Sequence, residues 1–304
     1  MYRHAYLLLA AGAVLGGADF EIKDAAEFKK LFPAGAKVTR LATDMQFIEG
    51  PAWTPGGFLV FSDIPANELK RYDAKGGLAT FRKPSNNTNG NTIDREGRLV
   101  SAEHFSHRIS RTEKDGTVVS LVEQFEGKNL NSPNDVVIKS DGTFWFTDPD
   151  YGLSGRKKEQ ASNNVYRFDE KTKSLTAVVK DFDKPNGLCF SPDESKLYVA
   201  DSGKPRHIRV FNVAKDGSVT GGSVFATIDK GVPDGIRCDT GGRVWSSSGD
   251  GAQIFAADGR LIARILLPES AANLTFGPKT LYLTARKSLY SVETKATMAK
   301  RPKK

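Results

Sequence analysis

The fold of this chain is decided by the stretch Asn134-Asp135-Val136-Val137-Ile138-Lys139-Ser140-Asp141-Gly142-Thr143-Phe144-Trp145-Phe146-Thr147-Asp148. This stretch consists of a polar residue, a run of β-forming residues, an Asp-Gly pair and a second β-forming run that ends at a polar residue. An Asp-Gly pair between two such runs is a strong local signal for a β-hairpin. Looser copies of the pattern occur elsewhere, and the six copies open at Glu49, Asn89, Asn134, Asn186, Asp234 and Asn273.

The spacing of these six opening residues predicts the fold. They are 40, 45, 52, 48 and 39 positions apart. A period of roughly 40 to 50 residues with several strands per unit is typical of β-propellers. We therefore predict an all-β, six-bladed β-propeller in which each opening residue lies at the start of the innermost strand of a blade. The six carboxylate and amide side chains would then converge on the central channel and form a candidate metal site.

Most copies also close at a polar residue. In four copies 14 positions separate the two residues: Glu49 to Asp63, Asn89 to Glu103, Asn134 to Asp148 and Asp234 to Ser248. The copy that opens at Asn186 closes one position later, at Asp201. Three opening residues follow a proline, which restricts the backbone, and Glu49, Asn186 and Asp234 each precede a glycine, which tolerates close packing. These features predict firmly held side chains near a crowded axis.

Composition and charge narrow the class of protein. The chain has 304 residues, of which 39% are hydrophobic and 26% charged, as is usual for globular proteins with a large core. Its formal net charge is +8, but the basic residues are scattered and are not interleaved with aromatic residues on one face. We therefore expect no nucleic-acid partner. The basic tail at residues 296–304 is interpreted as a solvated end.

The N-terminus has the pattern of a secretory signal peptide. A basic start is followed by an apolar run of 11 residues from Ala5 to Leu15 and by small residues up to Ala18. This run is shorter than the roughly 20 residues that span a bilayer. We expect residues 1–18 to be removed on export to the periplasm or the extracellular space. A helix at 24–32 and a strand at 37–42, which closes the last blade, are expected within 19–45, before a propeller at 46–295.

Two cysteines, Cys189 and Cys238, lie near the start of the fourth and fifth copies. Their offset within the repeat differs by one residue, which places them on opposite faces of equivalent strands. We expect two buried free thiols, although a disulfide is an alternative in an oxidising compartment. The chain has no Cys-x-x-Cys motif, so this type of zinc or redox site has no support.

The opening residues favour a hard cation. Carboxylate and amide oxygens without histidine or cysteine select Ca²⁺ or Mg²⁺, and Ca²⁺ tolerates irregular sets of such ligands. The alternative is a polar, water-filled channel that holds no metal. His104 directly follows the closing residue of the second copy, and a histidine near the channel would titrate in the range of a general base. Its alternative role is a hydrogen-bonding residue of the channel wall.

Several segments resemble the gluconolactonase / senescence-marker-protein / lactone-esterase family. The segments are Phe47-Ile48-Glu49-Gly50-Pro51, Asn131-Ser132-Pro133-Asn134-Asp135-Val136, Phe146-Thr147-Asp148-Pro149, Lys184-Pro185-Asn186-Gly187-Leu188 and Pro233-Asp234-Gly235. The resemblance extends from about Gln46 to Tyr290, and the motifs occur in the family's order. It implies a six-bladed propeller that holds one divalent cation, usually Ca²⁺, in its central channel.

The resemblance also implies roles for individual residues. Glu49 and Asp234 match the two carboxylate ligands of the metal, and Asn186 matches an amide ligand. Asn134 matches an amide that binds the metal in some members and the substrate in others. Some members hold the substrate with an arginine two positions before this amide, where this chain has Ser132. Because a hydroxyl cannot replace a guanidinium, the substrate is left open.

We therefore expect a Ca²⁺-dependent hydrolase that opens a sugar lactone such as gluconolactone, with Mg²⁺, Zn²⁺ or Mn²⁺ as alternative cations. The metal would polarise the lactone carbonyl, and Asp234 or His104 would take a proton from the attacking water. The absence of a Gly-x-Ser-x-Gly motif disfavours a serine hydrolase. Substrate contacts are expected from Asn91, Glu103, Asn134 and Tyr151.

Two other functions fit the same pattern. One is hydrolysis of a different ester, including a phosphotriester, and the other is a propeller that binds a sugar or peptide without turnover. Two carboxylates that face one cation favour an enzyme over a binding module. The expected partner is a small-molecule lactone, with no membrane association after signal removal, and the expected assembly is a monomer or weak dimer.

Overall fold

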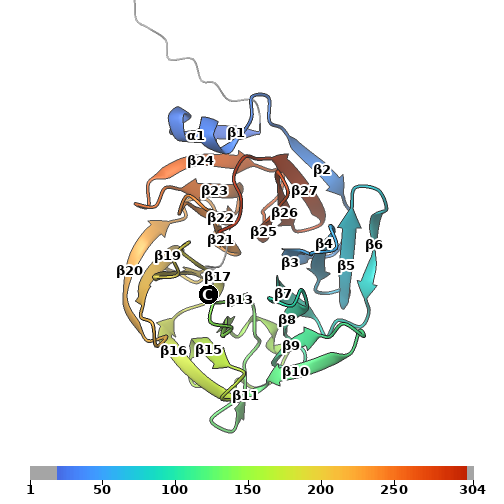
Figure 1. Cartoon of the computed structure of the whole chain (residues 1–304), viewed down its shortest axis with the longest axis vertical. Helices are drawn as coiled ribbons and strands as arrows, with labels where there is room; N and C mark the ends of the chain where they lie inside the picture. Colours follow the sequence, from blue (N-terminus) through green and yellow to red (C-terminus); the bar gives the residue numbers. More distant parts are fainter. Residues whose placement is uncertain (1–18, 300–304) are drawn as a thin grey trace, which may run out of the picture.

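Each copy of the repeated pattern folds into one antiparallel sheet, and six such sheets surround a central channel (Figure 1). The computed structural model describes residues 19–299, so the predicted signal peptide and most of the basic tail lie outside the described residues. The predicted six-bladed propeller is confirmed. Blades one to three, written from the innermost strand outward, are β3 (Ile48–Trp53), β4 (Leu59–Asp63), β5 (Glu68–Asp73) and β6 (Gly77–Arg82); β7 (Thr88–Ile93), β8 (Leu99–Glu103), β9 (Arg108–Thr112) and β10 (Val118–Val122); and β13 (Val136–Ile138), β14 (Phe144–Asp148), β15 (Asn163–Asp169) and β16 (Ser174–Phe182).

Blades four to six follow the same order around the ring. They are β17 (Pro185–Phe190), β18 (Lys196–Asp201), β19 (His207–Val213) and β20 (Val219–Thr227); β21 (Ile236–Cys238), β22 (Val244–Ser248), β23 (Gly251–Phe255) and β24 (Leu261–Leu266); and β25 (Asn273–Gly277), β26 (Thr280–Ala285) and β27 (Ser288–Glu293). Outside the blades, β11 (Gln124–Phe125) pairs with β12 (Lys128–Asn129), and the short 3₁₀ helix η1 (Tyr151–Leu153) follows β14.

The segment before the first blade closes the ring. Strand β2 (Val38–Ala42) pairs with β27 and becomes the outermost strand of blade six, as predicted. Helix α1 (Ala25–Leu31) is also as predicted, and its N-terminal cap, Asp24, accepts hydrogen bonds from the amides of Ala26 and Glu27. Strand β1 (Phe20–Ile22), which the sequence did not predict, pairs with β24 as a fifth strand of blade five.

The hydrophobic core lies between neighbouring blades. The second strands of blades one, two, three and five are buried at every position. Their large side chains, such as Phe61, Trp145 and Trp245, have no exposed surface. Cys189 and Cys238 are free and buried in one such cluster, because opposite faces of the adjacent blades four and five share an interface.

The closing residues of the repeat hold the chain where it enters the innermost strands. The carboxylates of Asp63, Asp148 and Asp201 each accept hydrogen bonds from two backbone amides located 16 to 18 residues earlier. These amides belong to Gln46 and Phe47, Asn131 and Ser132, and Asp183 and Lys184. The regular spacing of opening and closing residues thus fixes the segment that presents each opening side chain.

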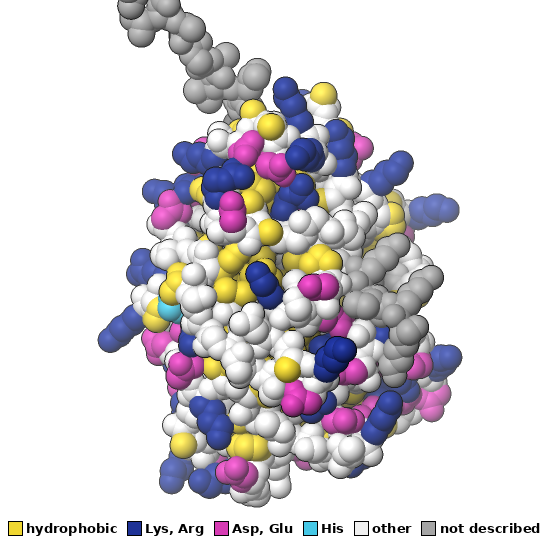
Figure 2. Space-filling view, turned by 60° about the vertical axis from the view of Figure 1, so that its left-hand side comes forward, with side chains coloured by type: hydrophobic (Ala, Val, Ile, Leu, Met, Phe, Trp, Pro, Cys, Tyr) yellow, Lys and Arg dark blue, Asp and Glu magenta, His cyan; other side chains and the backbone are white. Residues whose placement is uncertain are grey.

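None of the helices within residues 19–299 is long and apolar enough to cross a membrane. On the face that Figure 2 displays, basic and acidic side chains are interspersed rather than gathered by sign. This distribution gives no continuous basic surface on that face for a phosphate backbone.

Candidate active site

The six opening residues form a ring at one end of the channel, which we call the upper mouth. Neighbouring blades are joined there by hydrogen bonds: Gly90 N to Asn134 O at 2.7 Å, Thr147 Oγ1 to Asn186 O at 2.7 Å, Gly187 N to Asp234 O at 3.1 Å and Gly235 N to Ala272 O at 2.7 Å. The side chain of Asn273 donates to Glu49 at 2.8 Å between blades six and one, and Ser62 Oγ donates to Asn89 O at 2.7 Å between blades one and two, which closes the ring. The predicted convergence of the opening residues is therefore present.

Close packing explains the glycine that follows an opening residue. Gly50 has φ +53°, and a Cβ atom at this position would lie 2.0 Å from the backbone oxygen of Asn89. A Cβ atom at Gly235 would lie 2.0 Å from Cγ of Asn273. Any larger residue at either position would force the neighbouring blade away from the axis. The glycines thus allow opening residues of adjacent blades to approach one another.

Three side chains meet at the centre of the upper mouth: Glu49, Asn186 and Asp234. Burial raises the pKa of Asp234 well above its ordinary value, and repulsion from Glu49 raises it further, while a hydrogen bond from Asn186 opposes the shift. Burial, and then repulsion from Asp135, also raises the pKa of Glu49. Crowded carboxylates of this kind are stabilised in their charged form by a cation.

The donor atoms of this trio suit a hard cation. Oδ1 of Asn186 is buried and has no hydrogen-bond partner, and it belongs to the same cluster as the two carboxylates. Residues 19–299 contain no group of three or more His, Cys, Asp and Glu side chains with metal-binding geometry. The candidate set instead combines two carboxylates with amide oxygens, a mixture that Ca²⁺ accepts. Asn134 is buried just before β13 in the same ring of opening residues.

A buried network behind Glu49 was not foreseen from the sequence. Asn273 donates to Glu49 and contacts Oδ2 of Asp135 at 3.5 Å, and Arg237 donates to the same Asp135 oxygen at 3.2 Å. All four residues are buried. Because Asp135 and Arg237 compensate each other's charge, this network can orient Glu49 without adding net charge. In the sequence, the only signals for this network were that Asp135 follows an opening residue and that Arg237 lies inside β21.

Tyr151 reaches across the upper mouth from η1. Its hydroxyl interacts with the side chains of Ser202 and Asn186, yet burial of the hydroxyl still raises the pKa of Tyr151 far above its ordinary value. The residue as a whole remains 45% exposed, so its ring forms part of the surface that an incoming molecule meets. Nζ of Lys184 lies 5.7 Å from the centre of this ring and forms an ion pair with Asp150. The structure thus places Tyr151 beside the candidate metal ligands.

Two of the residues expected to contact substrate instead form hydrogen bonds within the fold. The amide nitrogen of Asn91 donates to the backbone oxygens of Gly50 and Asn89 and to Ser62, and its oxygen accepts from Ser101 at 2.7 Å. With 1% of its surface exposed, Asn91 ties blade two to blade one and offers no free atom to a substrate. These hydrogen bonds argue against the predicted substrate contact of Asn91.

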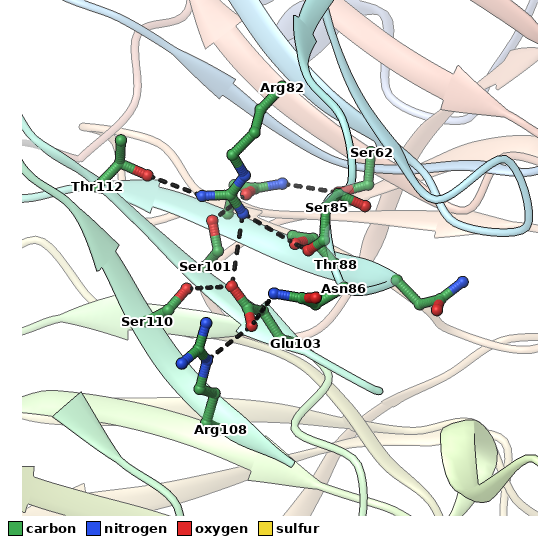
Figure 3. Close-up of polar contacts among 12 residues, drawn as sticks. Ser62, Arg82, Ser85, Asn86, Thr88, Ser101, Glu103, Arg108, Ser110 and Thr112 are labelled. Atoms are coloured by element: carbon green, nitrogen blue, oxygen red, sulfur yellow. Dashed lines mark hydrogen bonds and ion pairs between the residues drawn. The ribbon is translucent and has the colours of Figure 1, made fainter. Parts of the chain in front are cut away.

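Glu103 is also a structural residue, as Figure 3 shows. It has no exposed surface, and its carboxylate accepts hydrogen bonds from Arg108 at 2.7 Å and from Ser110 at 2.6 Å. Asn86 and Arg82 also donate hydrogen bonds to this carboxylate, at 3.1 and 3.5 Å. All its acceptor sites are directed at these partners within blade two and its neighbouring segments. These hydrogen bonds argue against the predicted substrate contact of Glu103.

His104 is buried next to the upper mouth but is poorly suited to act as a base. Its Nε2 lies 3.2 Å from the amide nitrogen of Asn89. Because an amide nitrogen only donates, Nε2 accepts this hydrogen bond and is not free for a water molecule. Burial, together with repulsion from Arg156, lowers the pKa of His104 to about 4. The structure therefore favours the alternative role of His104 as a hydrogen-bonding residue of the channel wall.

Comparison with known proteins agrees with this geometry. Residues 47–287 match the family described as the SMP-30/Gluconolactonase/LRE-like region. A gluconolactonase of Zymomonas mobilis is 32% identical over 287 residues, which cover 84% of this chain and 80% of that protein. A solved structure of a gluconolactonase from Xanthomonas campestris superimposes with a TM-score of 0.86 at 35% identity, covering 91% of this chain and 95% of that one.

A calcium-binding regucalcin from Agrobacterium tumefaciens shares the fold, with a TM-score of 0.70 at 23% identity over 88% of this chain and 98% of that one. The family match covers most of the described residues and includes Glu49, Asn134, Asn186 and Asp234. The ring of opening residues, the six blades and these similarities together show that this chain belongs to the SMP-30/gluconolactonase/LRE-like family.

Proposed function

We propose that this protein hydrolyses a sugar lactone such as glucono-1,5-lactone with the help of a divalent cation held by Glu49, Asn186 and Asp234, with Asn134 beside them. The observation that carries this proposal is the buried, unpartnered Oδ1 of Asn186, whose side-chain amide forms a hydrogen bond with Asp234 beside the second crowded carboxylate, that of Glu49. Relatives named as gluconolactonases, with 32% and 35% identity, support the lactone as substrate.

The chemistry follows from this arrangement of side chains. A divalent cation at this position would supply Lewis-acid polarisation of the lactone carbonyl. In this proposal Asp234 takes a proton from the attacking water, and its hydrogen bond with the side chain of Asn186 supports this role by orienting the carboxylate. Glu49 is held in place by Asn273 and supplies the second negative charge of the site. Tyr151 covers the mouth and orients the ring of the substrate from above.

Ca²⁺ is the favoured cation. A site of two carboxylates and neutral amide oxygens in irregular positions suits Ca²⁺ better than Mg²⁺, which demands a near-ideal octahedron. The Agrobacterium protein with the same fold is described as calcium-binding, which supports this choice. Mg²⁺, Mn²⁺ and Zn²⁺ are the alternatives to be tested. The proposal also includes export through residues 1–18 and a monomer or weak dimer in solution.

The test is turnover of glucono-1,5-lactone by protein treated with a chelator and then loaded with one cation at a time. Acid release is followed continuously, and the rate without protein is subtracted because this lactone also opens spontaneously. We expect activity to be lost with the chelator and restored best by Ca²⁺. Lack of turnover of any lactone in a panel, combined with tight sugar binding, would instead indicate a binding protein. Turnover of a phosphotriester alone would indicate the other ester hydrolase.

A further inference from the structure

The side-chain oxygen of Asn89, Oδ1, has no hydrogen-bond partner and no role in the proposed metal site. Asn89 opens the second copy of the repeat and lies in the ring of the upper mouth, where its backbone oxygen packs against Gly50, the neighbour of Glu49. Its side chain is buried, and Oδ1 has no hydrogen-bond partner. A buried, unsatisfied acceptor costs folding free energy, so an acceptor kept in this state points to a ligand that supplies a donor.

The other half of the same amide is fixed. Nδ2 of Asn89 donates to Nε2 of His104 at 3.2 Å, and this bond prevents the amide from rotating. The orientation follows from His104 because only a neutral imidazole with an unprotonated Nε2 can accept from an amide nitrogen. As long as the ring stays neutral, Oδ1 is the end of the amide that remains available.

The ring of His104 is itself held by the segment after β14. A Cβ atom at Gly152 would lie 2.4 Å from Cγ of His104, so this glycine lets the backbone pack directly on the imidazole. Ser132 fixes this segment, since its hydroxyl donates to Pro149 O at 2.6 Å and accepts from Gly152 N at 2.9 Å. Arg156 then donates to the backbone oxygens of both His104 and Gly152, at 2.9 and 2.8 Å.

We propose that Asn89 is a substrate-binding residue whose Oδ1 accepts a hydrogen bond from a ring hydroxyl of the lactone, and that His104 is its positioning residue. This inference rests on the proposed function. The proposal also assigns a role to Ser132, which anchors the segment that packs on His104. At this position some relatives are expected to carry a substrate-binding arginine.

The proposal predicts selectivity for hydroxylated lactones. A site with an unsatisfied acceptor gains from a substrate hydroxyl and gains nothing from a substrate that lacks one. Glucono-1,5-lactone and δ-valerolactone have the same six-membered ring, but only the first carries hydroxyl groups. The contribution of Asn89 should therefore appear in the ratio of kcat/KM for these two substrates rather than in either value alone.

The first experiment compares Asn89→Leu with the wild type, and Asn212→Leu is the matched control because Asn212 is exposed on β19. We expect Asn89→Leu to lower kcat/KM for glucono-1,5-lactone about 10-fold, mostly through KM, and to leave δ-valerolactone unchanged. Binding of gluconate by calorimetry should weaken to a similar extent. Asn212→Leu should change none of these quantities, and circular dichroism establishes that each variant folds.

The second experiment separates positioning from mere packing by replacing His104. We expect His104→Leu to reduce selectivity about as much as Asn89→Leu, because the amide loses the acceptor that fixes it. His104→Gln should retain most of the selectivity, because its side-chain oxygen can accept the same hydrogen bond. Equal effects of the two His104 variants on both lactones would overturn the positioning role.

Three further outcomes decide the proposal for Asn89. An equal loss for both lactones with weaker Ca²⁺ binding in calorimetry would make Asn89 a metal ligand and overturn the inference. Unchanged selectivity and unchanged gluconate binding would also overturn it. If the wild type opens no lactone, the proposed function fails, and the gluconate affinity of Asn89→Leu alone then decides whether Asn89 contacts a sugar hydroxyl.

Discussion

The two ends of the central channel differ in chemistry although the same strands line both. At the upper mouth the innermost strands begin with carboxylates and amides, of which Asn89 and Asn186 have unpartnered oxygens. At the opposite end, which we call the lower mouth, the same strands end in mainly apolar residues around a cavity of about 400 Å³, lined among others by Trp53, Ile93, Ile138, Phe190 and Met298. The residues that line this cavity do not include the proposed metal ligands Glu49, Asn186 and Asp234.

The proposed reaction site is therefore marked by oxygens without hydrogen-bond partners and not by cavity volume. Volume with apolar walls can hold a molecule but supplies no charge to a developing oxyanion.

Two buried glutamates, one at each mouth, allow the two ends of the channel to be compared by the same substitution. Glu49 lies among the candidate metal ligands, whereas Glu194 lines the lower cavity and accepts a hydrogen bond from Ser140 N at 2.7 Å. We expect Glu49→Gln to lower kcat/KM for glucono-1,5-lactone by about a thousand-fold, or about 4 kcal/mol, and to weaken Ca²⁺ binding, because the site loses one of two negative charges. Initial rates and calorimetry measure both effects.

Glu194→Gln is the control for this experiment. It removes the ion pair with Lys139, whose Nζ lies 3.4 Å away, and should reduce stability modestly without changing kcat/KM or Ca²⁺ affinity. If the two variants lost activity equally, the chemistry would not be confined to the upper mouth. Retention of full activity by Glu49→Gln would remove the assigned site altogether.

Arg237 connects the two mouths. Its side chain lines the lower cavity, and it donates to Asp135, which contacts Asn273 behind Glu49. Replacing Arg237 by methionine would leave Asp135 as an uncompensated buried charge, and removal of one partner of such a pair typically costs about 3 kcal/mol or more. We expect this loss in urea denaturation, together with a smaller loss of activity through Glu49.

The double variant Asp135→Asn with Arg237→Met tests the reason for that loss. Because it removes both charges, it should recover a large part of the stability lost in Arg237→Met. A double variant that is less stable than the single one would show that Arg237 acts mainly through packing. Activity that stays at the wild-type level in both variants would mean that Glu49 does not depend on this network.

His104 should make stability depend on pH. In the unfolded chain this ring gains a proton below about pH 6.5, whereas the buried ring stays neutral until pH falls to about 4. Because the unfolded state binds the extra proton, stability decreases as pH falls from 6.5 to 4, by at most about 3 kcal/mol. Thermal unfolding at several pH values should show a steeper fall for the wild type than for His104→Gln. Parallel curves for the two proteins would contradict this assignment.

The sequence was sufficient for the fold because each blade depends on local patterns. Asp-Gly turns, β-forming runs and the fixed distance between opening and closing residues all concern neighbouring strands, and they predicted the six blades and the convergence of Glu49, Asn186 and Asp234. The helix at α1 and the closing strand β2 followed from equally local signals. Strand β1 was missed because its three residues carry no distinctive pattern, and the short elements β11, β12 and η1 were missed as well.

The departures at the site came from geometry that the sequence pattern does not reveal. Strand β7 contains an irregularity between Thr88 and Asn91, which shifts the register with β8, so that Asn91 points into blade one while Asn89 keeps the free oxygen. Glu103 occupies the same repeat position as Asp148, but its carboxylate accepts a hydrogen bond from Arg108 on the next strand. Such pairings depend on side chains that meet only in the folded ring.

The smallest effect is expected at the lower mouth. Met298 is 44% exposed at the edge of the cavity, where its backbone pairs with Asp239 and where Ala299 N donates to Cys238 O at 2.9 Å. Because backbone contacts hold this segment, Met298→Ala should cost less than about 1 kcal/mol of stability and leave kcat/KM unchanged. Urea denaturation and initial rates measure both. A several-fold change in activity without a change in Ca²⁺ affinity would show that the lower mouth influences the reaction, and the division of the channel into a reactive and an inert end would no longer hold.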